Sequence, residues 1–332
     1  MLDGPQATSR LTPLQRRGQA IIDRLNGRLP PATDAASMPR IGIALGGGSA
    51  RGLTHIPYIE AMDELGLKPS VIAGTSIGAL LGAGWANGMS GAELREHSYS
   101  ALGTMRVIAS RLWGKQFGSL GGLFQNGLSV QLDGAQVVDG FLPTPFAERF
   151  EDLGIPLYVV ATDFQSWHQV VFHSGPLRPA IAGSIAIPTL FRPVSFAGHF
   201  LVDGGVVNPL PLDQAAADAD ILIGIDVNGD PSGRLDKVDY RPLDVWFGAA
   251  QIMMHSLIAH MMAAYPPDIF VRPHVDAFGV LEYWRVREII EHASKDKDNF
   301  KRQLSCKIEA FIADPERSLA TTPPHGLRRA PK

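Results

Sequence analysis

A serine at position 76 lies between two glycines in a pattern typical of a catalytic nucleophile. The motif Gly74 to Gly78 (GTSIG) directly follows the apolar run 71–73 and precedes a helical stretch, 79–86. Flanking glycines allow a sharp turn between a strand and a helix, so that the hydroxyl projects outward at the helix N-terminus. The helix dipole there favours developing negative charge. An ordinary capping turn of glycine and serine has the same pattern, so the nucleophile needs a second signal.

The second signal is a run of three glycines, Gly46, Gly47 and Gly48, between an apolar segment (41–45) and a helical stretch. Consecutive glycines expose backbone N–H groups and can form a concave anion site. A nucleotide phosphate site is disfavoured, because the spacing matches neither GxGxxG nor GxxxxGK[ST]. We therefore predict an oxyanion hole in this loop. The neighbouring Arg51 either orients the loop through a salt bridge or holds a lipid phosphate.

A serine nucleophile needs a base, and Asp203 is the candidate. It precedes two glycines, a context that is also common in ordinary turns. A Ser-His-Asp triad is the alternative, since His255, His260 and His274 follow the aspartate in the required chain order. The first two of these histidines lie in an apolar helical stretch, where a histidine with a structural hydrogen bond is expected. The sequence therefore favours Asp203 itself as the base.

Taken together, these blocks resemble the bacterial patatin-like phospholipases. The matching blocks span residues 40–227 and are, in order, 42–48 with Arg51, Gly52, Leu53 and His55; the motif around Ser76; 161–163; 184–188 with Pro193 and Val194; and 203–205 with Asn208 and Pro211. The resemblance implies an α/β fold, a three-layer α/β/α sandwich with a mainly parallel central sheet. It also implies a Ser76–Asp203 dyad without histidine that cleaves fatty-acyl esters of phospholipids, lysophospholipids or acylglycerols through an acyl-enzyme.

Two positions depart from the family pattern. Pro57 falls early in the helix after the glycine loop, where proline is tolerated only in the first turn, so we expect this helix to start late. Ser49 stands where the family often has glycine or alanine, which changes the backbone shape of the loop. Neither departure removes a donor from residues 46–48.

Composition narrows the alternatives. A formal net charge of −3 argues against nucleic acid as the main partner. The single cysteine, Cys306, excludes an intrachain disulfide; we expect it to be buried, and with no secretory leader it indicates a cytoplasmic location. Neither a HExxH motif nor paired cysteines occur, so no metal or other cofactor is predicted. A non-catalytic adaptor that binds lipid or protein on the same fold is the alternative from another functional class.

The chain divides into three predicted parts. Residues 1–39 read as a helical extension and linker, 40–314 as the catalytic domain and 315–332 as a disordered tail. Within the domain, the glycine-rich segment 102–134 is predicted to be a mobile cap. The predicted strands are 41–45, 70–73, 156–161, 169–172 and 221–227, and the predicted helices are 53–65, 77–86, 135–140, 243–265 and 281–312.

The helix 243–265 is nearly free of charge and has aromatic residues near both ends. Four polar residues, among them Gln251 and His260, would need partners in hydrocarbon, which disfavours a membrane span. We therefore expect either a core helix or a membrane-facing helix. Its methionines could line an acyl tunnel, and a membrane-facing helix would bring the protein into transient contact with a membrane surface.

Overall fold

The computed structural model describes residues 38–102, 131–143, 145–217, 219–229 and 242–313. The elements from Pro39 onward belong to one compact unit. The predicted N-terminal helix, the C-terminal tail and nearly all of the predicted cap lie outside the described residues.

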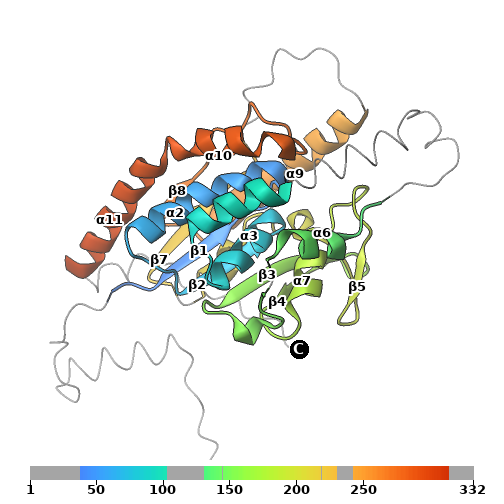
Figure 1. The fold of residues 1–332 in the computed structure, drawn as a ribbon, viewed down its shortest axis with the longest axis horizontal. Coiled ribbons are helices and arrows are strands. Elements are labelled where there is room, and N and C mark those ends of the chain that lie inside the picture. The colour runs from blue at the N-terminus through green and yellow to red at the C-terminus, as the bar shows by residue number, and fades with distance from the viewer. Residues whose placement is uncertain (1–37, 103–130, 144, 218, 230–241, 314–332) are drawn as a thin grey trace, which may run out of the picture. The chain divides into compact units, whose positions relative to one another are not determined.

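A mostly parallel sheet forms the centre of the unit (Figure 1). Among the described residues its order is β5-β6-β3-β2-β1-β7-β8, and β4 pairs with β3. Strands β3, β2, β1, β7 and β8 run parallel to one another, whereas β4, β5 and β6 are antiparallel to their neighbours. The strands are β1 (Ile41–Leu45), β2 (Val71–Thr75), β3 (Leu157–Asp163), β4 (His168–Phe172), β5 (Val194–Phe196), β6 (His199–Asp203), β7 (Ile221–Ile225) and β8 (Ile269–Val271).

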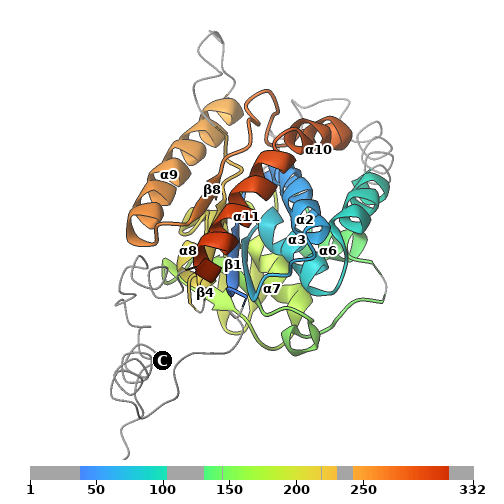
Figure 2. The ribbon, with the colours of Figure 1, turned by 90° about the vertical axis from the view of Figure 1, so that its left-hand side faces the viewer.

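Helices cover both faces of the sheet, with α8 and α9 on one face and α2 and α3 on the other (Figure 2). Alternation along β1 explains this, because Ile43 and Leu45 join the large core cluster while Ala44 joins the smaller one under α8 and α9. The three-layer α/β/α prediction is thus confirmed. The helices are α2 (His55–Glu64), α3 (Ile77–Ala86), α6 (Gly134–Phe141), α7 (Leu177–Ser184), α8 (Leu212–Ala215), α9 (Pro242–Ala264), α10 (Val286–Ser294) and α11 (Lys297–Ala313).

Most predicted elements are present, with two kinds of difference. The elements β5, β6, β8, α7 and α8 were not predicted. Each has three to eight residues, and these residues by themselves do not distinguish a strand or helix from a loop. The predicted helix 281–312 is instead a 3-10 turn (Tyr283–Arg285), α10 and α11. The helix after the glycine loop does start late: a 3-10 helix (Ser49–Thr54) precedes α2, which places Pro57 in its first turn.

The burial predicted for Cys306 is wrong, because this side chain is exposed on α11. The residues that α11 buries recur every three to four positions at Phe300, Leu304, Ile308 and Phe311, so position 306 faces away from the core. None of the described helices is both long and apolar enough to cross a membrane.

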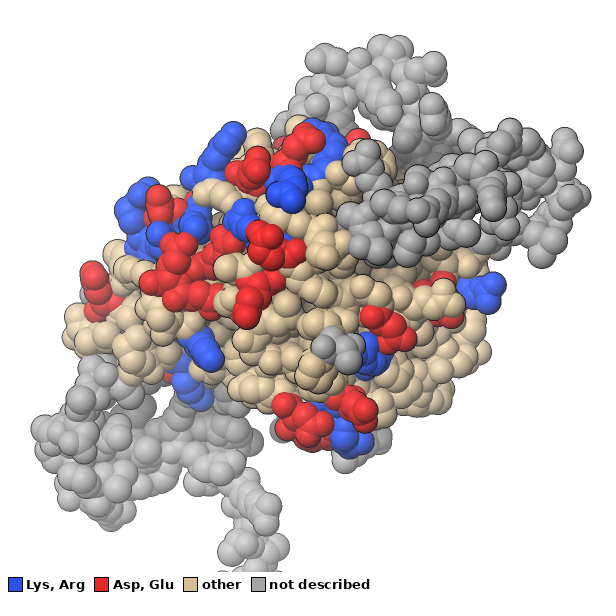
Figure 3. All heavy atoms as spheres, viewed as in Figure 1, with Lys and Arg blue, Asp and Glu red and all other residues tan. Residues whose placement is uncertain are grey.

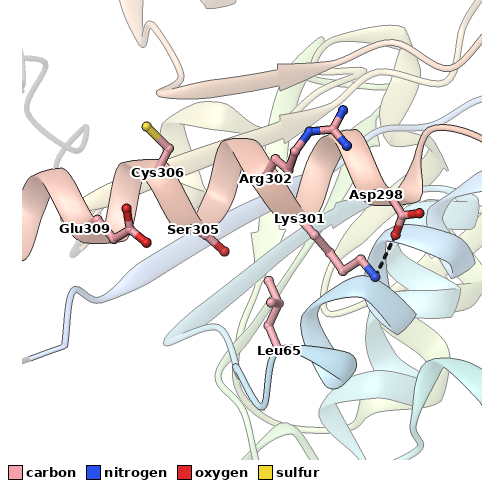
Figure 4. A pocket seen from close by; sticks show the side chains of 7 residues that line it. All are labelled: Leu65, Asp298, Lys301, Arg302, Ser305, Cys306 and Glu309. Carbon is pink, nitrogen blue, oxygen red and sulfur yellow. Dashed lines mark ion pairs between the residues drawn. The ribbon is translucent and has the colours of Figure 1, made fainter.

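Charged side chains of both signs lie interspersed over α2, α10 and α11 on the face shown in Figure 3. Lys297 and Lys301 both bond to Glu64, and Lys301 also pairs with Asp298. The hollow in Figure 4 lies beside α11 in this charged region and is lined by Leu65, Asp298, Lys301, Arg302, Ser305, Cys306 and Glu309. It contains none of the candidate catalytic residues.

Candidate active site

Two strands meet end to end beside β3. Strand β2 runs parallel to the first half of β3 and ends with Thr75 opposite Val160. Strand β6 approaches from the other direction and ends with Asp203 opposite Ala161. The other edge of β3 is occupied by β4. The residue that follows β2, Ser76, therefore lies next to the last residue of β6.

The backbone at Ser76 has the strained conformation that is expected of a nucleophile elbow. Its φ of 56° and ψ of −124° are unusual for a residue with a side chain. Its N–H donates to Ser184 Oγ at 2.9 Å, and this hydroxyl donates to Val160 O at 2.6 Å. The buried Ser184 therefore ties the elbow to strand β3 and helps to maintain the strain.

The two elbow glycines are required by space. A Cβ atom on Gly74 would lie 2.6 Å from the backbone of Ala79, and one on Gly78 would lie 2.2 Å from Leu45 O. Any side chain at either position would push α3 away from strands β1 and β2. In this packing, only glycine fits at positions 74 and 78 without a shift of the neighbouring backbone.

Ser76 and Asp203 form a direct hydrogen bond. Ser76 Oγ donates to Asp203 Oδ2 at 2.6 Å, and the other carboxylate oxygen accepts the N–H of Gly205 at 2.7 Å. Both side chains are buried. Burial raises the pKa of Asp203 to about 6, although its hydrogen bonds from Ser76 and Gly205 act in the opposite direction. The carboxylate is thus a stronger base than an exposed aspartate and is still ionised at neutral pH.

In the described parts of the chain, no histidine hydrogen-bonds to Ser76 or Asp203. His255 Nε2 is bonded to Gly229 O, and His260 Nδ1 is bonded to the carbonyl oxygen of Ser256 in its own helix. These contacts are the structural hydrogen bonds expected for histidines of an apolar helix. The geometry favours a two-residue arrangement over a Ser-His-Asp triad.

The glycine loop packs directly against the serine, since a Cβ atom on Gly47 would lie 3.2 Å from Ser76 Cβ. Two of its three N–H groups already have partners: Gly46 donates to Ile225 O at 3.0 Å and Gly47 to Pro209 O at 2.9 Å. Gly48 has no hydrogen-bond partner for its N–H among the described residues. Of the three glycines predicted to form an oxyanion hole, Gly48 is therefore the one whose N–H is available to a substrate in the described structure.

Two buried side chains, His55 and Arg51, hold this loop in place through hydrogen bonds to main-chain carbonyl oxygens. His55 Nε2 bonds to Gly46 O at 2.8 Å, and burial lowers the pKa of His55 to about 4, so the ring is neutral at physiological pH. Arg51 is only 2% exposed and donates to Phe278 O at 2.8 Å and to Asn228 O at 2.6 Å. Because its guanidinium is engaged with main-chain carbonyls, the contacts favour the loop-orienting role of Arg51 over binding of a lipid phosphate.

Sequence reasoning assigned no role to Ser184, Thr75 or Thr162, although all three hydroxyls support the site. Thr75 Oγ1 donates to Asn208 O, and Thr162 Oγ1 donates to Asp203 O. Their signal in the sequence was a hydroxyl residue within an otherwise apolar buried run. Across the described ranges, no three His, Cys, Asp or Glu side chains are arranged to hold a metal ion.

The chain is similar to several known proteins. A family model described as "Patatin-like phospholipase" matches residues 43–216. An uncharacterized NTE family protein of Mycobacterium tuberculosis is 37% identical over 199 residues, which cover 60% of this chain and 52% of the relative. Lysophospholipase NTE1 of Pyricularia oryzae is 26% identical over 290 residues, covering 80% of this chain and 18% of the relative. VipD from Legionella pneumophila aligns with a TM-score of 0.42 at 12% identity, covering 80% of this chain and 67% of that structure. The chain thus spans about half of its mycobacterial relative.

Proposed function

Because the chain belongs to the patatin-like phospholipase family, we propose that it hydrolyses fatty-acyl esters with Ser76 as nucleophile and Asp203 as base. The observation that carries this proposal is the 2.6 Å hydrogen bond from a strained, buried serine to a buried aspartate. A lipid- or protein-binding adaptor has no need of a serine held in this conformation or of a carboxylate with a raised pKa.

In the proposed mechanism, Asp203 Oδ2 accepts the proton of Ser76 as Oγ attacks the ester carbonyl. The N–H of Gly48, together with that of Ile77 at the start of α3, stabilises the oxyanion of the tetrahedral intermediate. Protonated Asp203 then gives its proton to the leaving alcohol oxygen. Water attacks the acyl-enzyme with Asp203 again as base, which releases the fatty acid and restores Ser76.

The proposed substrates are phospholipids, lysophospholipids or acylglycerols. The family and the lysophospholipase name of the fungal relative support this class. Helix α9 adds a structural reason, because Met254 Cε would lie 3.1 Å from a Cβ atom on Gly205, two residues from the base. A flexible apolar side chain at that distance can form part of the wall along which an acyl chain lies.

Covalent labelling tests the proposal. A fluorophosphonate probe is expected to label the purified protein at Ser76, since an activated serine attacks the phosphorus and the oxyanion site stabilises the adduct. Mass spectrometry of the digested protein locates the label. The Ser76→Ala variant provides the control and is expected to lose the label completely.

The opposite outcome has a clear meaning. If the folded wild-type protein takes up no label, either alone or with added phosphatidylcholine vesicles, the hydrolase proposal is wrong. The hypothesis of a non-catalytic adaptor then replaces it. Label on a different serine would equally remove Ser76 from its proposed role.

We further propose that the protein docks transiently on a membrane surface. Four large apolar residues of α9 are exposed at positions 245, 246, 252 and 253, a spacing that places them on one face of the helix. No Asp, Glu, Lys or Arg occurs from 245 to 264.

The turn after β3 adds two exposed aromatic residues to this proposed membrane-binding surface. They are Phe164 and Trp167, which are 59% and 82% exposed. Since β3 runs parallel to β2 and extends past its end, this turn lies at the same edge of the sheet as Ser76.

Replacing the two aromatic residues of the turn is expected to weaken vesicle binding by roughly tenfold or more. The substitutions remove the exposed rings that would otherwise insert into the membrane interface. The suitable double variant is Phe164→Ala with Trp167→Gly. Trp167 has a φ of 64°, which glycine also adopts without strain. Co-sedimentation with phosphatidylcholine vesicles measures the binding.

Ile312→Ala is the matched control, since Ile312 is an exposed apolar residue near the end of α11 and is expected to leave vesicle binding unchanged. Hydrolysis of a short water-soluble ester should be the same in all three proteins. Equal vesicle binding by the double variant and wild type would show that the turn does not contact the membrane.

A further inference from the structure

The glycine loop is held by residues 278–283, a segment between β8 and α10. This segment lies beyond residues 43–216, the part that the family model matches. Ala50 donates its N–H to Val280 O at 2.9 Å, next to the bond from Arg51 to Phe278 O. Residues far apart in the sequence thus meet directly behind the proposed oxyanion site.

The side-chain contact in this segment joins Tyr283 to Ser49. Tyr283 Oη lies 2.9 Å from Ser49 Oγ in a hydrogen bond. Burial raises the pKa of Tyr283 to about 12, and the negative charge of Asp203 contributes to the rise. Tyr283 is therefore protonated, and able to donate, throughout the pH range in which Asp203 is ionised.

Ser49 has reason to need this bond. Its φ of 56° lies in the left-handed region, which is strained for a residue with a Cβ atom. Ser49 directly follows Gly48, so a change in the φ of Ser49 has to be offset by a change in the ψ of Gly48. That change turns the Gly48 N–H relative to Ser49 and the residues that follow it. A Cβ atom on Gly48 would lie 2.8 Å from Val227 O, so the other side of the loop is already confined.

We infer that Tyr283 is a positioning residue of the active site: its hydroxyl holds Ser49 in its strained conformation and thereby aims the Gly48 N–H at the substrate oxygen. This inference rests on the proposed hydrolase function and adds to it. Tyr283 does not contact the reacting atoms in this assignment. Its effect passes through Ser49, and this route is what an experiment can isolate.

A double-mutant cycle of Tyr283→Phe and Ser49→Ala tests the inference with a short water-soluble ester as substrate. Each single variant is expected to lower kcat roughly tenfold with KM little changed, since a misaimed donor loses part of the roughly hundredfold effect of an oxyanion donor. The double variant is expected to be no slower than the slower single variant, because both changes break the same bond. Rates are divided by the concentration of active sites, titrated with fluorophosphonate.

Tyr58→Phe is the matched control. Tyr58 in α2 is fully buried, and its hydroxyl has no partner among the described residues, so losing it should leave kcat unchanged. A double variant whose defect equals the product of the two single defects would overturn the inference. A Tyr283→Phe protein with the kcat of wild type would also overturn the inference. The same holds if this variant has fewer active sites but an unchanged kcat per active site, because the loss would then be structural. A wild-type protein with neither hydrolysis nor label overturns the proposed function and this inference together, whereas an active wild type with an unaffected Tyr283→Phe variant overturns the inference alone.

Discussion

Asp203→Asn is expected to lower kcat for ester hydrolysis by roughly 10⁴-fold and at the same time to stabilise the folded protein above pH 6. The amide keeps the shape of the side chain but cannot accept the proton of Ser76, and replacing the aspartate of a serine triad has an effect of about that size. The gain in stability has a separate cause, the cost of keeping a charged carboxylate buried.

The direction of the pH dependence follows from the raised pKa of Asp203, about 6 in the folded protein against 3.8 for an ordinary aspartate. A raised pKa means that folding favours the protonated form. The stabilisation that protonated Asp203 provides is therefore fully present below pH 4 and is lost as the pH rises through 6. Over this range the free energy of unfolding falls by roughly 3 kcal/mol. Since asparagine does not ionise, the variant should avoid up to that cost at pH 8 and resemble wild type at pH 4.

Urea unfolding at pH 4 and pH 8 measures the stability of both proteins, and wild-type kcat/KM against pH should show an acid limb with its midpoint near 6. Asp163→Asn is the matched control with the opposite sign. Its hydrogen bond with His199, followed by that with Ser166, keeps the pKa of Asp163 below its usual range, so this variant should lose stability at neutral pH. An Asp203→Asn protein that is less stable than wild type at pH 8, or an acid limb below pH 5, would contradict the assignment.

Gly78→Ala is expected to cost about 3 kcal/mol of stability and to reduce hydrolysis by at least a hundredfold. The added Cβ atom would lie 2.2 Å from Leu45 O, and a main-chain carbonyl of a central strand cannot move aside as a flexible side chain can. Helix α3 must therefore shift away from β1. Because Ser76 immediately precedes α3, the shift would break its alignment with Asp203.

Gly140→Ala provides the comparison, since Gly140 lies in α6 and a Cβ atom there meets nothing within 4 Å. Alanine favours a helix, so this variant should be up to about 1 kcal/mol more stable than wild type. Unfolding curves and fluorophosphonate labelling rates of the two variants give the answer. If Gly78→Ala is labelled as fast as Gly140→Ala, the elbow tolerates the shift and the spatial requirement for glycine is refuted.

The elements with a clear pattern within their own residues were predictable. Strand β1 and helix α3 begin and end at the predicted residues, and α9 differs from its prediction by one residue at each end. Strand β6, which carries Asp203, was not predicted, because its partner is β3 and its five residues show no period of their own. The strand that completes the site thus depends on a contact between distant parts of the chain.

The sequence by itself determined which residues could carry out the proposed ester hydrolysis. They are a serine between two glycines, a run of three glycines and an aspartate that precedes two further glycines. These signals are local, since they reflect the backbone conformations that each short segment can adopt. Only the tertiary structure decided how they combine. Ser76 meets Asp203, 127 positions away, because β2 and β6 end beside the same edge of β3. Three further features depend on burial and on neighbours from other elements, which no local pattern contains. They are the raised pKa of Asp203, the contact of Tyr283 with Ser49 and, among the described residues, the lack of a partner for the Gly48 N–H in the glycine loop.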